Sequence, residues 1–304
     1  MRALVTGGAG FIGSHVCEAL IRLGYEVIAV DDLTTGKPAN LNGLSMQFII
    51  TSSTAPKVRD LFTRGRFDLI VHLAARNIIS SSTDPYGDFH TNVTETFGIL
   101  DLARKSGAKV ICASSCSVYG QADEFPTSES APMRPVSYYA ASKICGETYC
   151  EVFRQLHEMN ITVVRYSNVY GPRQHIGVVP SMIRKTISKE QIEINGDGSH
   201  VRDYTYIDDA VEATMRLINV SNGVYNIASG VGTTTLELAN TVSKVCEAPL
   251  NVQHVNERSI DNISHRVLSC TALEKTTNFK CQTNLSEGLT RTVEWWRSEN
   301  SLAY

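Results

Sequence analysis

The sequence predicts an α/β protein built on a doubly wound parallel sheet, with a smaller C-terminal α/β lobe. Short apolar segments rich in β-branched residues alternate with helical patterns through the first half of the 304 residues, and a glycine-rich turn joins the first strand to the first helix. After residue 174 the pattern loosens into short strands and turns such as "NGDGS". Repeated β-α-β units of this kind form a sheet that binds ligands at the carboxyl ends of its strands.

Five segments have the continuous apolar character of strands that are buried on both faces: 2–6, 25–30, 68–73, 109–114 and 161–166. Between them, helical spacing places Val16, Leu20 and Leu23 on one face before Gly24. A second helix is predicted from Val93, Phe97 and Leu100, ending at Gly107. A closing amphipathic helix is predicted at 285–296.

These elements predict two units. Residues 1–173 are expected to form the first domain, rejoined by part of 203–229, and residues 174–304 the smaller lobe. No internal repeat or low-complexity linker separates the two, so the lobe is expected to pack tightly on the first domain.

Composition excludes several classes of partner. Hydrophobic residues make up 42% of the chain, charged residues make up 19%, and the formal net charge is -3 without any basic run. Nucleic acid and an anionic membrane surface are therefore not expected as partners. No apolar stretch approaches the roughly 18 residues that a membrane-spanning helix needs, and "MRALVTGG" does not resemble a signal peptide. The expected location is cytoplasmic.

Eight cysteines are scattered along the chain without a C-x-x-C pair or a Cys/His zinc spacing. Reduced and mostly buried thiols are expected in a chain of this size with no export signal. No metal site is predicted.

The first strand runs directly into "TGGAGFIGS", in which Gly7, Gly10 and Gly13 are three residues apart. A sharp strand-to-helix turn that brings the backbone close to a pyrophosphate needs glycine at such points. The next strand ends at Asp31 and Asp32, about 20 residues further on. Carboxylates there accept hydrogen bonds from ribose hydroxyls and repel a 2′-phosphate, which predicts NAD rather than NADP.

The segment "SYYAASK" places Tyr139 one helical turn before Lys143. Residues four apart share one face of a helix, so a phenol and an ammonium are offered to the same ligand. A free tyrosine has a pKa near ~10, and holding it as phenolate at neutral pH costs about 4 kcal/mol. A nearby cation in a partly buried site can supply much of that energy.

These motifs, taken together and in order, resemble the extended short-chain dehydrogenase/reductase family, in its nucleotide-sugar epimerase and dehydratase branch. The resemblance covers nearly the whole chain. Its further marks are "DDLTTG", "HLAA", Asn92, "SSCSVYG", "RYSNVYGPRQ", "GDGSHVRDYTYIDD" and "YNIASG". It implies a Rossmann fold, dependence on NAD, and chemistry carried by a tyrosine and a lysine.

The resemblance also assigns roles to individual residues. Tyr139 is the implied general base, Lys143 holds the nicotinamide ribose and stabilises the phenolate, and Ser115 hydrogen-bonds the reacting oxygen. The implied cofactor-binding residues are Gly7, Gly10, Phe11, Ile12, Gly13, Asp31, Asp32, Leu33, Leu73, Ala74, Ala75, Asn92, Tyr139, Lys143 and Tyr166. The implied substrate-binding residues are Ser115, Asn168, Arg202, Arg258 and Asp261, with Asp261 either orienting Arg258 or meeting a ribose.

The implied reaction is NAD-dependent 4-epimerisation of a nucleotide sugar, most simply a UDP-sugar, through a 4-keto intermediate. Dehydratases and decarboxylases of the family carry acidic residues beside the catalytic hydroxyl, where this chain has Cys116 and Ser117. Either reaction stays open as an alternative, as does a non-catalytic NAD-binding scaffold on the same fold. A uronate substrate would need an extra cation, for which Arg173 and His175 are candidates.

The resemblance further implies a homodimer. In relatives, the helix that carries Asn92 and the helix that carries Tyr139 pair with their symmetry mates in a four-helix bundle. Phe97, Cys150 and Phe153 are expected to supply apolar contacts at this interface.

Overall fold

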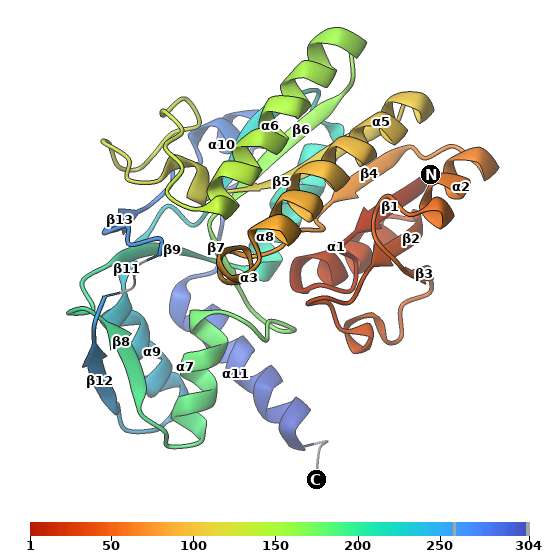
Figure 1. The fold of residues 1–304 in the computed structure, drawn as a ribbon. Helices are drawn as coiled ribbons and strands as arrows, with labels where there is room; N and C mark the ends of the chain where they lie inside the picture. Colours follow the sequence, from red (N-terminus) through yellow and green to blue (C-terminus); the bar gives the residue numbers. More distant parts are fainter. Residues whose placement is uncertain (258–259, 302–304) are drawn as a thin grey trace.

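A seven-stranded parallel sheet forms the centre of the protein (Figure 1). The computed structural model describes residues 1–257 and 260–301, without the side chains of 300 and 301. The strand order is β10-β6-β5-β4-β1-β2-β3. The strands are β1 (Arg2–Thr6), β2 (Glu26–Asp31), β3 (Gln47–Ile50), β4 (Leu69–His72), β5 (Lys109–Ser115), β6 (Ile161–Tyr166) and β10 (Gly223–Ile227). The five predicted strands are confirmed within one residue at each end.

Helices cover both faces of this sheet, because alternate residues of each strand point to opposite sides. Ala3 and Val5 of β1 pack with α1 (Phe11–Arg22) and α8 (Ile207–Arg216), whereas Leu4 packs on the other face. That second face is covered by α2 (Pro56–Arg64), α5 (Thr96–Ser106) and α6 (Tyr138–His157). The chain adds β2 and β3 on one side of β1 and then returns to add β4, β5 and β6 on the other side. At this reversal, between β1 and β4, a crevice opens at the carboxyl ends of the strands.

Short helices fill the connections of the first part. They are η1 (Pro38–Leu41), α3 (Ile78–Thr83), α4 (Pro85–Phe89), the π-helical η2 (His90–Glu95), η3 (Cys116–Tyr119) and η4 (Leu217–Asn219). No helix in the described ranges is long and apolar enough to cross a bilayer. The cytoplasmic location stays a prediction.

The lower part of Figure 1 holds the second group of elements. Two small sheets are formed there by β7 (Asn168–Tyr170), β9 (Val201–Tyr206), β11 (Gly232–Thr234) and β13 (His265–Arg266), and by β8 (Ile192–Asn195) and β12 (Val252–Val255). The helices there are α7 (Val178–Ile187), α9 (Thr235–Cys246) and α11 (Leu285–Ser301), whereas α10 (Thr271–Thr277) lies in the upper part of Figure 1 and contacts β10 and α8. One hydrophobic cluster runs from α1 and α8 into α7, α9 and α11, so the lobe packs tightly on the sheet.

Two predicted helix faces need correction. Leu23 lies just after α1 and is 55% exposed, because α1 ends at Arg22 and only Val16 and Leu20 reach the core. Phe97 is 44% exposed, since it lies on the outer side of α5 while Val93 and Leu100 are buried. The predicted end of α5 is confirmed, because Gly107 adopts the left-handed conformation with φ at +69°.

A buried ion pair ties α6 to the sheet. Nη2 of Arg165 on β6 lies 2.6 Å from Oε2 of Glu147 on α6, and the two side chains are only 5% and 7% exposed. Nε of Arg165 also donates to Oε1 of Glu147 at 3.0 Å. If the two side chains separated inside the protein, each would carry a buried charge without water to hydrate it. Because that is costly, the pair fixes the position of α6 on β6.

Replacing Glu147 by glutamine should therefore destabilise the protein strongly. We expect Glu147→Gln to lower the free energy of unfolding by about 3–5 kcal/mol, because the Arg165 guanidinium stays buried without a counter-ion. Urea denaturation followed by circular dichroism measures this change. The control is Glu151→Gln, which removes the more exposed pair of Glu151 with Arg154 and should cost about 1 kcal/mol or less. Equal losses for the two variants would contradict the prediction.

Candidate active site

A glycine-rich turn forms one wall of a cavity at the carboxyl ends of the central strands. Gly7 follows β1 with φ at +69°, a conformation that residues with a Cβ rarely adopt. A Cβ on Gly13 would lie 2.0 Å from the carbonyl oxygen of Gly7, so α1 can begin this close to the turn only with glycine there. No side chain caps α1 at Gly10. Its free N–H groups suit an anion.

The cavity has a volume of about 460 Å³ and collects most of the predicted site residues. It is lined by Gly7, Gly10, Phe11, Ile12, Gly13, Asp31, Asp32, Leu73, Ala74, Ala75, Ser115, Tyr139, Lys143, Tyr166 and Asn168. The predicted residues Leu33, Asn92, Arg202 and Asp261 do not line it. Arg258 lies outside the described residues.

Asp31 ends β2 with its carboxylate buried against the glycine turn. Oδ2 accepts a hydrogen bond from the backbone N–H of Ala9 at 3.0 Å, and Oδ1 accepts one from the N–H of Leu33 at 2.8 Å. Burial raises the pKa of Asp31, and these bonds oppose that rise. Each oxygen keeps a second lone pair, which a ribose hydroxyl can use. Leu33 takes part through its N–H, and the exposed Asp32 accepts from the N–H of Thr34 at 2.9 Å.

Tyr139 and Lys143 lie on one face at the start of α6, as the sequence predicts. The side chain of Ser137 caps this helix by accepting from the N–H of Ala140 at 3.1 Å, which places Tyr139 in the first turn. Nζ of Lys143 lies 5.9 Å from the centroid of the Tyr139 ring. It also donates to the carbonyl oxygen of Ala113 on β5 at 3.0 Å. The phenol and the ammonium are thus held together at the end of β5.

Ser115 completes this group, because it lines the same end of the cavity and its hydroxyl acts to lower the pKa of the Tyr139 phenol. Its Oγ already accepts from the N–H of Ser117 at 3.1 Å, so its hydroxyl proton is available for the phenol oxygen or for a ligand oxygen. Ser115 therefore acts as a donor to whichever oxygen carries negative charge.

Burial controls the charges of these groups. It raises the pKa of Tyr139 to about 12, against the opposing hydrogen bond from Ser115. It lowers the pKa of Lys143. Ionising a phenol with a pKa of about 12 costs about 7 kcal/mol at neutral pH. The protein side chains alone therefore leave Tyr139 protonated, and the pair needs a further positive charge in the cavity.

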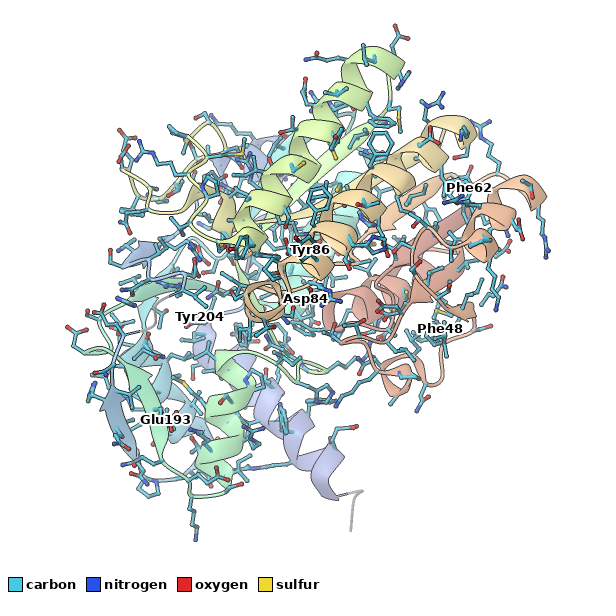
Figure 2. All side chains as sticks on the ribbon, viewed as in Figure 1. Phe48, Phe62, Asp84, Tyr86, Glu193 and Tyr204 are labelled. Atoms are coloured by element: carbon cyan, nitrogen blue, oxygen red, sulfur yellow. The ribbon has the colours of Figure 1, made fainter. Side chains whose placement is uncertain are left out.

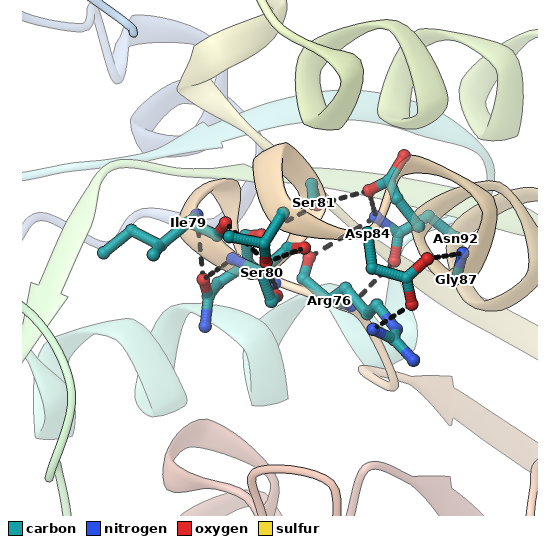
Figure 3. Close-up of polar contacts among 10 residues, drawn as sticks. Arg76, Ile79, Ser80, Ser81, Asp84, Gly87 and Asn92 are labelled. Carbon is teal, nitrogen blue, oxygen red and sulfur yellow. Dashed lines mark hydrogen bonds and ion pairs between the residues drawn. The ribbon is translucent and has the colours of Figure 1, made fainter.

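Asn92 supports the cavity wall from behind instead of lining it. Its Oδ1 accepts from the backbone N–H of Arg76 at 2.9 Å, and its Nδ2 donates to the carbonyl oxygen of Arg76 at 3.3 Å (Figure 3). These bonds fix the loop after β4, in which Leu73, Ala74 and Ala75 line the cavity. Asn92 therefore positions the loop for which the sequence predicts cofactor contacts.

Arg76 is a cavity residue that the sequence analysis did not identify. One guanidinium nitrogen, Nη1, donates to Oδ2 of Asp84 at 2.9 Å (Figure 3), while its buried Nε has no hydrogen-bond partner. Its place directly after the "HLAA" segment was the available signal. The sequence analysis also did not identify four further residues that line the cavity from different parts of the chain: Ser53, Glu95, Gln174 and Gly177.

The predicted substrate residues lie on neighbouring strands of the second group. Arg202 on β9 is half-buried, and burial lowers its pKa. Asp261 has a partner that the sequence did not suggest: Nη2 and Nη1 of Arg266 lie 2.6 and 3.1 Å from its two carboxylate oxygens. Arg266 pairs in register with Arg202 across β13 and β9. The predicted link between Asp261 and Arg258 falls on the undescribed part of the chain.

The two candidate cations for a uronate are engaged elsewhere. Nη2 of Arg173 lies 2.8 Å from Oε2 of Glu18 on α1. His175 packs against the rings of Trp295 and Trp296, with centroids 5.6 and 6.0 Å away. Neither residue lines the cavity.

Comparison with known proteins identifies the family. Residues 3–228 match the model of the NAD dependent epimerase/dehydratase family. The chain is 33% identical to a UDP-glucose 4-epimerase of Mycolicibacterium smegmatis, over 99% of this chain and 100% of that protein. It is 32% identical to a UDP-N-acetyl-alpha-D-glucosaminuronate decarboxylase of Bacillus cytotoxicus, over 97% and 98% of the two chains.

A solved structure gives the same result for the fold. The crystal structure of a UDP-glucose 4-epimerase with UDP-glucose from Thermotoga maritima matches this chain with a TM-score of 0.95. The two chains are 34% identical, and the match covers 99% of this chain and 100% of that one. The relatives include both epimerases and decarboxylases, so family membership alone leaves the reaction and the sugar unassigned. The chain therefore belongs to the NAD dependent epimerase/dehydratase family and is an enzyme that uses NAD.

Proposed function

We propose that the protein is a UDP-sugar 4-epimerase that oxidises carbon 4 of the sugar and reduces it again from the opposite face. The observation that carries the proposal is that Ser115, Tyr139 and Lys143 line one end of the cavity that begins at the glycine turn, with Nζ of Lys143 5.9 Å from the centroid of the Tyr139 ring. This arrangement is suited to removing a proton from a sugar hydroxyl.

Each residue has a defined part in the proposed reaction. The phenol oxygen of Tyr139 takes the proton of the 4-hydroxyl, and the hydroxyl of Ser115 donates a hydrogen bond to the same sugar oxygen as charge develops on it. Lys143 supplies a positive charge beside the phenolate. When bound, NAD supplies the acceptor and donor for the hydride of carbon 4, and its positively charged ring offsets the cost of ionising Tyr139. The same phenol returns the proton when carbon 4 is reduced.

The surroundings of Ser115 favour epimerisation over dehydration or decarboxylation. Those reactions need an acid or base beside the 4-keto sugar, but Cys116 and Ser117 occupy the adjacent positions and are both buried. The nearby carboxylate of Glu147 is held by Arg165 and by the hydroxyl of Ser114. With Glu147 held in this way and no acidic residue at positions 116 and 117, the proposed keto intermediate has re-reduction as its favoured fate.

The second part of the chain is the proposed nucleotide-sugar lobe. Asn168 and the start of α7 at Gly177 line the cavity, and no side chain caps α7. Together with Arg202 they offer amide and guanidinium donors to a diphosphate. The engagement of Arg173 and His175 elsewhere supports a sugar without a carboxylate. A UDP-hexose or its N-acetyl relative is therefore the proposed substrate.

A substrate panel tests this proposal. We expect purified protein with NAD to convert UDP-glucose or UDP-N-acetylglucosamine to the 4-epimer, as read by proton NMR, and to leave UDP-glucuronate and dTDP-glucose unconverted. Loss of mass from a substrate would indicate dehydration or decarboxylation. No turnover of any donor would favour the scaffold alternative.

The Tyr139→Phe variant tests the mechanism. We expect its kcat to fall by about 100-fold or more, because the proton acceptor is removed, while NAD binding measured by calorimetry stays close to that of the wild type. The matched control is Tyr138→Phe, which changes the neighbouring, 61% exposed tyrosine and should leave turnover unchanged. Undiminished turnover in Tyr139→Phe would overturn the proposed mechanism.

We also propose that the protein forms a homodimer through α5 and α6, which lie side by side at the front of Figure 1. The contact residues differ from those expected, because Cys150 and Phe153 are buried inside the chain. The exposed apolar residues of this face are Phe97, Val152 and Leu156, which are 44%, 40% and 72% exposed. A continuous apolar face on two paired helices suits packing against its symmetry mate.

Leu156→Asp should disrupt this dimer, because a charge would be buried at the interface. In sedimentation equilibrium we expect the wild type at about twice the chain mass of 33.4 kDa and the variant at that mass. The control is Ile187→Asp, which changes a 41% exposed residue at the end of α7 and should remain dimeric. A monomeric wild type would refute the proposal.

A further inference from the structure

Asp88 is a buried carboxylate next to the site, and neither the sequence motifs nor the proposed mechanism uses it. It lies on the short helix α4 and is 2% exposed. Its Oδ1 accepts from the hydroxyl of Ser81 at 2.5 Å and from Nδ2 of Asn92 at 2.6 Å. No cation forms an ion pair with Asp88 in residues 1–257 and 260–301, although burying a lone charge is costly.

A chain of hydrogen bonds leads from Asp88 to the catalytic helix. Nδ2 of Asn92 also donates to Oγ of Ser142 at 3.1 Å, and that hydroxyl donates to the carbonyl oxygen of Tyr139 at 3.0 Å. Ser142 directly precedes Lys143. Asp88 is thus linked through two side chains to the backbone that carries both the phenol and the ammonium.

We infer that Asp88 is a positioning residue that sets the working pH of the Tyr139–Lys143 pair, through the chain Asp88–Asn92–Ser142 and through its own buried charge. The inference rests on the proposed function, because it concerns the same phenol and ammonium. It assigns Asp88 no contact with substrate or cofactor.

The charge of Asp88 acts on both groups in the same direction. Burial lowers the pKa of Lys143, and Cys112, Asp88 and Glu147 oppose that fall. Burial also raises the pKa of Tyr139, and the charge of Asp88 raises it further. Asp88 therefore keeps the ammonium protonated and makes the phenol harder to ionise.

The other titratable groups that face the pair are neutral, are paired with a cation or, like Cys112, lie against a second thiol. His72 on β4 is neutral, because burial lowers its pKa to about 3. Glu147 is paired with Arg165. Burial raises the pKa of the Cys116 thiol. The interaction between the thiols of Cys112 and Cys150 lowers the pKa of Cys112 and, together with burial, raises that of Cys150. Asp261 is paired with Arg266. Asp84 on the neighbouring turn is paired with Arg76.

The test is the pH profile of kcat for wild type and Asp88→Asn, with NAD and whichever UDP-sugar the wild type turns over. Removing the charge lowers the pKa of both Tyr139 and Lys143. The rising limb, which reports ionisation of the phenol, and the falling limb, which reports loss of the lysine proton, should therefore both move to lower pH. We expect each limb of the profile to move by about half a pH unit or more, because a buried charge acts on nearby groups through a low effective dielectric constant.

Two further variants separate charge from structure. Asp88→Ser removes the charge with a smaller side chain and should give the same shift, so the test does not depend on one variant folding. Asp84→Asn keeps an acceptor that can cap α4 while removing the neighbouring carboxylate, and its profile should stay in place. Profiles of the Asp88 variants that do not move, or that move to higher pH, overturn the inference even where kcat falls.

A second measurement separates this inference from the proposed function. The tyrosinate absorbance of the NAD-loaded protein is titrated with pH, and the titration of Tyr139→Phe is subtracted. The difference reports the pKa of Tyr139 without any turnover. Absence of turnover in the wild type would refute the proposed function alone, whereas an unchanged pKa of Tyr139 in Asp88→Asn would refute the role of Asp88.

Discussion

The candidate active site depends on one constraint, which is that the phenol of Tyr139 and the ammonium of Lys143 are buried together, away from water. Tyr139 and Lys143 are fixed at the start of α6, and α6 is fixed on β6 by the buried pair of Glu147 with Arg165. Desolvation works against the charged form of both groups, so the site holds its reactive charge only when further charges enter the cavity. In the proposed mechanism, that requirement makes ionisation of Tyr139 depend on an occupied cofactor site.

The cavity is shaped by backbone groups and supported by polar side chains behind it. The glycine turn brings N–H groups within reach of an anion because Gly7 and Gly13 leave no room for a Cβ. Asn92 fixes the facing loop through both polar groups of the Arg76 backbone. It lies in a π-helical turn, and such turns are frequent at functional sites. Tyr86, on the preceding helix α4, is 92% exposed and is labelled in Figure 2.

Sequence reasoning succeeded where the determinant is local. The strand bounds, the glycine turn, the end of α5 at Gly107 and the one-turn spacing of Tyr139 and Lys143 each follow from a few adjacent residues. It failed where a partner comes from far along the chain. Arg173 meets Glu18, and Asn92 meets Ser142, only because strands and helices bring them together. The spacing of apolar residues also does not show where a helix ends or which of its residues other elements bury. Leu23 lies beyond the end of α1, and Cys150 is buried on α6. The roles of the individual site residues in catalysis stay predictions.

The last strand of the central sheet has a consequence for how the protein is made. β10 pairs with β6 along its whole length, yet 56 residues of chain separate the end of β6 at Tyr166 from the start of β10 at Gly223. During synthesis, β6 leaves the ribosome as an unprotected apolar edge and keeps that state until β10 has emerged. Exposed strand edges of this kind recruit other chains. Until β10 has been synthesised, this edge of β6 is therefore open to pairing with other chains instead of with its own sheet.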